Sequence, residues 1–255
     1  MQTEKSNMTS MKPYMKSDFF SALSPAALAD FDNLVVPISQ PANKVLFSET
    51  QDNCGVMVVV EGEVKLSINS SDGRRLSLRI ARVGELLGLS STLSGNAYEM
   101  TADTLYPAKI AHLSRQAFLH FMARHPEVYE AATREISRSF NLACEQLRMV
   151  GLSTSVPERL ARLLLGWSDA TPQQKTDAAP KQETGARCRV SLTHEQIGEF
   201  IGASRETVTR TLSIFKNRQL VAQHGCTITI PSRMALESYF QQRTVLWDAA
   251  REEIV

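Results

Sequence analysis

The sequence predicts an α+β protein in which a long helix links a β-rich domain to a smaller helical one. Three observations support this. Short segments of alternating apolar and polar residues fill much of 35–113, a regular apolar helix follows from residue 125, and a glycine separates two short helices before a hairpin at 221–230. Because alternation with a period of two is typical of strands that bury one face, the first domain should be a β-roll or a sandwich.

Length and composition are those of an ordinary globular protein. The chain has 255 residues, of which 43% are hydrophobic and 22% charged, and its net charge is +1. A charged partner would therefore have to meet a local patch. The N-terminal residues contain no apolar core of signal-peptide length, and no run reaches the roughly 20 apolar residues that span a membrane. We expect a cytoplasmic protein without a membrane partner.

The first domain should cover residues 19–124, after a flexible tail over residues 1–18. Helical spacing over 19–34 predicts a helix, and the alternating segments that follow predict strands. Two of these segments flank Ser70-Ser71-Asp72-Gly73, which is typical of a hairpin turn.

The third segment, residues 125–151, should be one long helix. Pro126 suits its first turn, and apolar residues recur after three or four positions, as in a helix that meets another helix. This near-heptad seam favours a homodimer contact, and the alternative is a helix packed on its own domain. The predicted seam residues are Val128, Ala132, Ile136, Phe140, Ala143, Leu147 and Val150.

The second domain should cover residues 152–243, followed by an exposed tail over 244–255. A leucine-rich helix opens it, and the polar stretch 168–187, with two prolines and a glycine, should be a loop inside this domain. The segment 221–230 should form a two-stranded wing.

Local signals define the two short helices between that loop and the wing. Thr193 and Gln196 have the spacing of a capping box, Gly202 should end the first helix, and Ser204 should cap the second. Two short helices joined by a turn that contains glycine form a helix-turn-helix, and an added β-hairpin makes it winged.

This motif points to double-stranded DNA as the partner, because its second helix enters the major groove. Arginine pairs with guanine through two hydrogen bonds, and glutamate accepts from a cytosine amino group. Arg205, Glu206 and Arg210 should therefore face base edges from the first two turns. The same exposed face carries Thr209, and the hydroxyls nearest the helix N-termini should contact phosphates; these belong to Thr193, Ser204 and Thr207.

The alternative is that Glu206 and Arg210, four residues apart, form a surface salt bridge. The charge over 189–230 favours DNA only mildly, with five lysines and arginines against three glutamates. The order of the predicted parts favours a DNA-binding protein: a β-rich domain comes first, then a dimer seam, then a winged helix-turn-helix. A nucleotide-binding module that never touches DNA would leave the two arginines unexplained.

The segment "LTHEQIGEFIGASRETVTRTLSIFKNRQLV" followed by "HGCTITI" resembles the DNA-binding domain of the CRP/FNR family of bacterial transcription regulators. The resemblance extends upstream through "VEGEVKL" and "VGELLGLSS" and covers roughly residues 19 to 240. It implies a cyclic-nucleotide-binding-type β-roll of the double-stranded β-helix or jelly-roll kind, a dimerisation helix and a winged helix-turn-helix. It also implies a TGTGA-type half-site, read by Arg205, Glu206 and Arg210, and RNA polymerase as a further partner.

The sequence departs from the family in the sensor domain. Members that bind cyclic AMP have Gly-Glu-Leu followed, some ten residues later, by Arg-Ser-Ala. Here Gly84-Glu85-Leu86 is present, but Tyr98-Glu99-Met100 stands at the second position. A carboxylate there repels phosphate and no arginine neutralises it, although Arg75, Arg79 or Arg82 could replace the missing cation. We expect an effector other than cyclic AMP, bound near Gly84, Glu85, Leu86, Tyr98 and Glu99.

Other sensing chemistries remain alternatives, and the sequence assigns no cofactor. The four cysteines (Cys54, Cys144, Cys188 and Cys226) stand far apart, and residues 1–53 contain none, whereas the iron–sulfur branch needs three close together near the N-terminus. Haem could use one of the histidines, but no metal-ligand spacing is present. The absence of the common catalytic motifs also argues against an enzyme.

Overall fold

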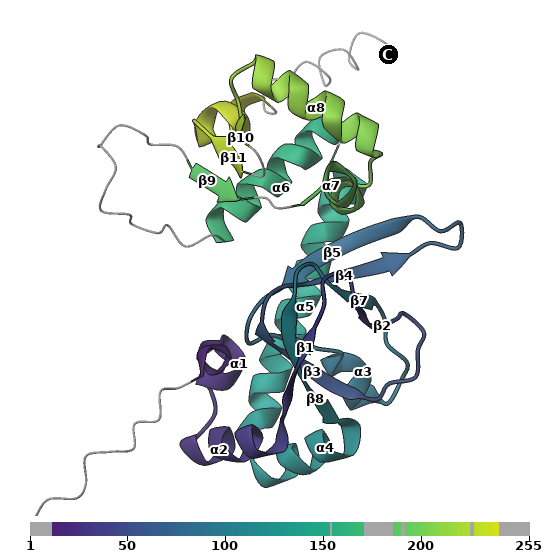
Figure 1. Cartoon of the computed structure of the whole chain (residues 1–255), viewed down its shortest axis with the longest axis vertical. Helices are drawn as coiled ribbons and strands as arrows, with labels where there is room; N and C mark the ends of the chain where they lie inside the picture. Colours follow the sequence, from purple (N-terminus) through teal and green to yellow (C-terminus); the bar gives the residue numbers. More distant parts are fainter. Residues whose placement is uncertain (1–11, 154, 171–185, 190–191, 225–226, 240–255) are drawn as a thin grey trace, which may run out of the picture. The chain divides into compact units, whose positions relative to one another are not determined.

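The computed structural model describes residues 12–153, 155–170, 186–189, 192–224 and 227–239. The chain divides into two compact units, Met1–Cys144 and Glu145–Val255, which we describe separately (Figure 1).

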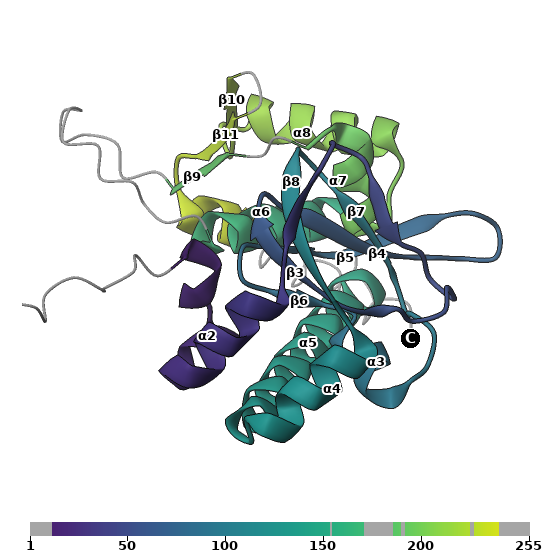
Figure 2. The ribbon, with the colours of Figure 1, turned by 60° about the horizontal axis from the view of Figure 1, so that its bottom comes forward.

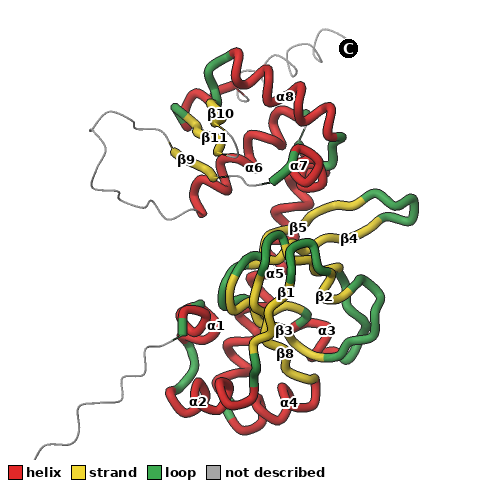
Figure 3. The backbone as a smooth tube through the Cα atoms, viewed as in Figure 1, coloured by secondary structure: helices red, strands yellow, loops and turns green. Residues whose placement is uncertain are grey.

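The first unit contains two four-stranded antiparallel sheets (Figure 3). One has the order β1-β8-β3-β6, with the bounds Pro37–Gln40, Ala108–Ser114, Gly55–Glu61 and Leu86–Leu87. The other has the order β2-β7-β4-β5, with the bounds Val45–Phe47, Thr101–Thr104, Val64–Asn69 and Arg75–Ala81. The expected β-roll is confirmed.

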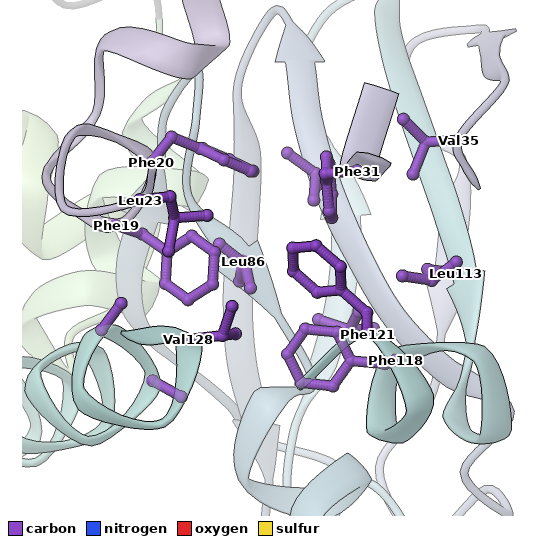
Figure 4. Close-up of a cluster of buried hydrophobic side chains, with 14 of the residues drawn as sticks. Phe19, Phe20, Leu23, Phe31, Val35, Leu86, Leu113, Phe118, Phe121 and Val128 are labelled. Atoms are coloured by element: carbon purple, nitrogen blue, oxygen red, sulfur yellow. The ribbon is translucent and has the colours of Figure 1, made fainter. Parts of the chain in front are cut away.

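The helices of the first unit cover one face of the β1-β8-β3-β6 sheet. In chain order they are η1 (Pro13–Lys16), α1 (Asp18–Ser21), α2 (Pro25–Leu34), α3 (Leu89–Ser94), α4 (Arg115–Arg124) and the long α5 (Glu127–Leu152). The core on this face is rich in phenylalanine, and Figure 4 shows Phe31, Phe118 and Phe121 close together within it. The turned view in Figure 2 shows α4 and α5 beside each other.

A second core lies between the two sheets. Because side chains alternate along a strand, β8 sends Ala108 and Ile110 into this core, and Ala111 and Leu113 toward the helices. The sheet that contains β8 is therefore buried on both faces.

The N-terminal part of this unit differs from the prediction. Ser24 caps a new helix at Pro25, so the expected helix over 19–34 is two helices, α1 and α2. The predicted tail over residues 1–18 is also wrong for its second part, because the Tyr14 side chain is fully buried. The Tyr14 hydroxyl donates to Asp32, and burial raises the pKa of that tyrosine. Residues 1–11 lie outside the described chain.

The second unit contains α6 (Val156–Ala170), β9 (Ala186–Arg189), α7 (His194–Ile201), α8 (Arg205–Asn217), β10 (Ala222–His224) and β11 (Thr227–Ile230). Its sheet has the order β10-β11-β9, so the expected two-stranded wing gains a third strand. The sequence alone does not predict this strand. β9 has only four residues, and every second one is an arginine, so it lacks the apolar residues typical of a strand. A helical stretch over 233–239 follows, and the predicted tail at 244–255 lies outside the described residues.

None of the helices in the described segments is long and apolar enough to cross a membrane.

Candidate functional site

The helix-turn-helix is built by the local signals that predict it. Thr193 caps α7, accepting from the Gln196 backbone while the Gln196 side chain accepts from the Thr193 amide, so the capping box is confirmed. Gly202 ends α7 at a φ of 60°, in the left-handed region that favours glycine. Ser204 then caps α8, accepting from the Thr207 amide at 3.3 Å.

The two sides of α8 differ sharply in burial. Val208, Leu212 and Phe215 are buried, with at most 1% of their surface exposed. Arg205, Glu206 and Arg210 are exposed, and they lie on the first two turns of the helix. α8 is thus anchored along one side and presents a charged surface on the other.

The salt-bridge alternative fails for this surface. Within the described part of the chain, neither Arg205 nor Arg210 forms an ion pair with a carboxylate, and Glu206 pairs with no cation. Its own backbone amide, the Ser204 hydroxyl and the nearby charge of Arg205 lower the pKa of Glu206. Glu206 therefore stays ionised at neutral pH, as an acceptor for a base amino group must.

Thr209 is exposed on α8, as predicted, and its hydroxyl also makes contacts within the motif. Its hydroxyl donates to the Arg205 backbone oxygen at 2.9 Å, and its oxygen lies 2.8 Å from Nδ1 of His194 on α7. Thr209 therefore joins the two helices of the motif, and its contact with DNA stays a prediction. His194 is not among the predicted site residues, and its position beside the Thr193 cap is the signal in the sequence that could have identified it.

Of the three hydroxyls predicted for phosphate, those of Thr193 and Ser204 cap helices. Thr193 and Ser204 accept from backbone amides, and the hydroxyls of Ser204 and Thr207 lie 3.1 Å apart. Because a hydroxyl that accepts a hydrogen bond still has a proton to donate, capping leaves the Thr193 and Ser204 hydroxyls able to donate to a phosphate.

Two side chains fasten the C-terminal end of α7. Gln146, near the end of α5, donates to the Phe200 backbone oxygen at 2.7 Å, and Arg159 of α6 donates to the Ile201 backbone oxygen, also at 2.7 Å. Carbonyls at the end of a helix lack partners within the helix, so these bonds fix where the turn begins. The spacing of the helix-turn-helix motif in the sequence does not predict a role for Gln146 or Arg159.

In the sensor domain, Gly84, Glu85 and Leu86 have structural contacts. Gly84 has a φ of 87°, and a Cβ atom there would lie 2.5 Å from Ser17. Glu85 forms ion pairs with Arg79 and with Arg138 of α5, and Leu86 is buried in the core beneath the helices. These contacts give the three residues a structural role, and their part in an effector site stays a prediction.

Tyr98 belongs to the other core. It is 2% exposed, its ring stacks on Phe47 with centroids 3.9 Å apart, and its hydroxyl donates to the Gly55 oxygen at 2.8 Å. Glu99 is exposed and accepts from the Ser91 hydroxyl at 2.6 Å. Leu86 and Tyr98 thus belong to different cores and Glu99 lies on the surface, so the grouping of the five residues in one effector site stays a prediction.

The three arginines that might replace the missing cation all have acidic partners. Arg79 pairs with Glu85, as described above. Arg75 lies 3.3 Å from Asp103, and Arg82 lies 3.9 Å from Glu63. None of the three is free to neutralise a phosphate without giving up a contact. Among the described residues, no group of three or more histidine, cysteine or acidic side chains is arranged to hold a metal ion.

The predicted dimer seam divides into two parts along α5. Val128 and Ala132 are 0% and 1% exposed, and Figure 4 shows Val128 close to Phe19 and Leu86 in the core of its own domain. These two residues are therefore not available to a second copy. Further along, Phe140 and Leu147 are 67% and 68% exposed. Of the other seam residues, Ile136, Ala143 and Val150 are half-buried.

Comparison with known families assigns both parts of the chain. The profile of the cyclic nucleotide-binding domain matches residues 37–125, and that of the Crp-like helix-turn-helix domain matches residues 158–239. The chain belongs to the CRP/FNR family of transcription regulators. The resemblance seen in the sequence is therefore confirmed, and a CRP/FNR protein is a DNA-binding regulator and not an enzyme.

Curated CRP/FNR relatives match over most of their length. A CRP-like cAMP-activated global transcriptional regulator of Mycobacterium tuberculosis is 27% identical over 216 residues, which cover 84% of this chain and 92% of the relative. The transcriptional activatory protein AadR of Rhodopseudomonas palustris is 28% identical over 215 residues, which cover 83% and 84%.

Solved CRP/FNR structures share the fold. FixK2 of Bradyrhizobium japonicum superposes with a TM-score of 0.67 at 20% identity and covers 80% of this chain and 96% of its own. The c-di-GMP responsive regulator CLP of Xanthomonas campestris gives a TM-score of 0.67 at 18% identity and covers 82% and 100%.

Proposed function

We propose that this protein is a homodimeric CRP/FNR-type regulator that reads a TGTGA-like palindrome with α8. One observation supports this above all. Arg205, Glu206 and Arg210 are exposed together on the first two turns of α8, without ion-pair partners in the described chain, while the opposite side is buried.

The chemistry of the three side chains fits such a half-site. Each arginine can donate two hydrogen bonds to O6 and N7 of a guanine, and the ionised Glu206 can accept from a cytosine amino group. Two recognition helices related by a two-fold axis would read half-sites whose centres lie about 34 Å apart. A bacterial DNA partner would place the protein in the cytoplasm, with RNA polymerase as the next partner.

Selection from random DNA tests this assignment. The wild type should enrich a palindrome close to TGTGA-N6-TCACA. Arg205→Ala and Arg210→Ala should each cost about 1–3 kcal/mol per half-site and relax the preference at one base pair. Glu206→Ala should relax specificity with a smaller loss of affinity, because removing an acid also relieves repulsion from phosphates.

Arg162→Ala provides a matched control. Arg162 is an exposed arginine of α6 in the same unit, paired with Glu158 at 2.9 Å. Its loss removes one positive charge but should leave the enriched sequence unchanged. If the wild type enriches no palindrome, or Arg210→Ala enriches the same one undiminished, α8 is not the reader.

We further propose that the effector is not cyclic AMP. Tyr98 is packed inside the β-roll at the place of the family arginine, Glu99 adds a carboxylate beside it, and Arg75, Arg79 and Arg82 have acidic partners. Isothermal titration should therefore detect no cyclic AMP binding at about micromolar affinity. Such binding would instead mean that one of these arginines leaves its partner.

A cyclic nucleotide bound in a non-standard way is the second candidate. It is favoured by the M. tuberculosis relative, whose name states activation by cAMP. Haem or redox sensing is the third. Mass spectrometry of the protein purified from its native host would identify a bound nucleotide or another small effector, and absorption in the visible range would reveal haem or a redox group.

A further inference from the structure

His194 stands where the two helices of the DNA-reading motif meet. It is the first residue of α7, and its Nδ1 atom lies 2.8 Å from the Thr209 hydroxyl oxygen on α8. Among the described residues, His194 makes no other side-chain hydrogen bond, so its Nε2 atom has no protein partner there.

The Thr209 hydroxyl fixes which imidazole nitrogen carries the proton. That hydroxyl has one proton, and it donates it to the Arg205 backbone oxygen at 2.9 Å. Its oxygen can therefore only accept from His194, so Nδ1 must be the protonated nitrogen. In the neutral ring Nε2 is then an acceptor, and it becomes a donor only when the ring takes up a second proton.

The charges around His194 are mainly positive. Burial, Lys216 and Arg205 together lower the pKa of His194 in the free protein. The acids closest in sequence on the two helices are Glu195 and Glu206, and in the described chain neither pairs with His194. From α6, Arg159 is bonded at the far end of α7. An anion bound beside Arg205 and Lys216 would offset their positive charge. It would therefore raise the pKa of His194 and favour the protonated ring.

We propose that His194 contacts a DNA phosphate through Nε2 only as imidazolium, so that DNA binding takes up a proton at each α7. The proposal rests on the proposed DNA-reading function and adds a residue to that interface. Because phosphate and not a base is the partner, the proton should be taken up on any duplex, whatever its sequence.

The test measures the dissociation constant of the full chain for two duplexes between pH 6 and pH 8 at constant salt. One duplex carries TGTGA-N6-TCACA and the other a scrambled sequence. Constant salt is needed because phosphate contacts are salt-dependent. We expect binding to both duplexes to be about five- to tenfold tighter at pH 6 than at pH 8 for each protomer engaged.

Three variants separate His194 from other titrating groups. His194→Gln keeps a donor for Thr209 but cannot titrate, so the pH dependence should disappear. His194→Arg is always charged and should bind at pH 8 as tightly as the wild type does at pH 6. His224→Gln alters the exposed histidine of the wing strand β10 and should keep the full pH dependence.

The outcomes distinguish this proposal from the DNA-reading function itself. If His194→Gln keeps the wild-type pH dependence, or an NMR titration shows an unchanged His194 pKa on DNA, the proposal is overturned. If both duplexes bind equally well with the expected pH dependence, the phosphate contact stands and the TGTGA assignment fails. If the wild type binds neither duplex at any pH, both are lost.

Discussion

Glu135 is an acid on the buried side of α5, and only 6% of its surface is exposed. Its Oε1 atom has no hydrogen-bond partner, and its only ion pair in the described chain is a long one, 3.9 Å, to Arg138. Burial raises the pKa of Glu135 and the charge of Glu85 raises it further, while Arg138 opposes the shift. Burial therefore disfavours the ionised form of this carboxyl group inside the domain.

We expect Glu135→Gln to stabilise the protein, and to do so more at pH 8 than at pH 5. A carboxyl group whose pKa is raised by folding holds its proton more tightly in the folded state. The wild type therefore loses stability as the pH rises from the unfolded pKa through the folded one, and the glutamine variant does not. Urea unfolding of both proteins at the two pH values measures the difference. An equal difference at both values would show that Glu135 is not the titrating group.

At the scale of elements, α8 depends on its cap for both stability and position. Ser204 accepts from the Thr207 amide, and Arg205, which we expect to reach the bases, is the next residue. Losing this cap and losing a phosphate contact would both weaken DNA binding, so simple removal of the hydroxyl cannot separate the two roles.

A pair of substitutions at Ser204 separates them. Ser204→Ala should lower stability by about 1 kcal/mol because the cap is lost. Ser204→Asp keeps a good cap but places a negative charge where a phosphate should lie, so stability should be preserved while affinity falls for every duplex. Thermal unfolding and DNA titration of both variants provide the comparison. Undiminished affinity in the aspartate variant would remove Ser204 from the phosphate contacts.

The elements that could be predicted are those with local causes. The capping box at Thr193, the glycine turn at Gly202 and the cap at Ser204 each involve residues within a few positions of one another. The third wing strand and the burial of Tyr14 depend on partners far along the chain. The pairing of β9 with β11 across more than 35 residues leaves no trace in either segment alone.

The candidate site divides in the same way. The predicted base-reading residues could be found from the sequence alone. The apolar residues of α8 recur with the period of a helix, and this places Arg205, Glu206 and Arg210 on the opposite, exposed side. The effector assignment relied on a short motif alone, and it stays a prediction. Whether Glu85 binds a ligand or pairs with Arg79 and Arg138 depends on how the strands and α5 meet. His194 was missed because its role arises from contact with a residue 15 positions away.

For the whole molecule, the exposed apolar residues of α5 are the evidence for a dimer. Phe140 and Leu147 are separated by seven residues and expose two-thirds of their surface, whereas the seam residues nearer the start of α5 are buried in their own domain. A strip of this kind on a long helix is typical of contact with a second helix.

Replacing Phe140 and Leu147 together by glutamate should give monomers, because two buried like charges would face each other across the two-fold axis. These monomers should no longer bind a duplex with two half-sites. Val128→Ala is the control: it should lower stability by about 0.5–3 kcal/mol through the cavity it leaves, while the dimer persists. Sedimentation velocity measures the mass of each variant, and unchanged dimers in the double variant would exclude this seam.

The short N-terminal helix η1 has a consequence for the turnover of the protein. Tyr14 is fully buried and bonded to Asp32, and Ser17 donates to the backbone oxygen of Gly84. A cellular protease that cut the chain after Ser17 would release an aromatic side chain from the core, at a cost of about 3–5 kcal/mol. One cleavage in this segment would thereby destabilise the first unit. The lifetime of the protein in the cell should depend on how firmly η1 stays packed against the core of the first unit.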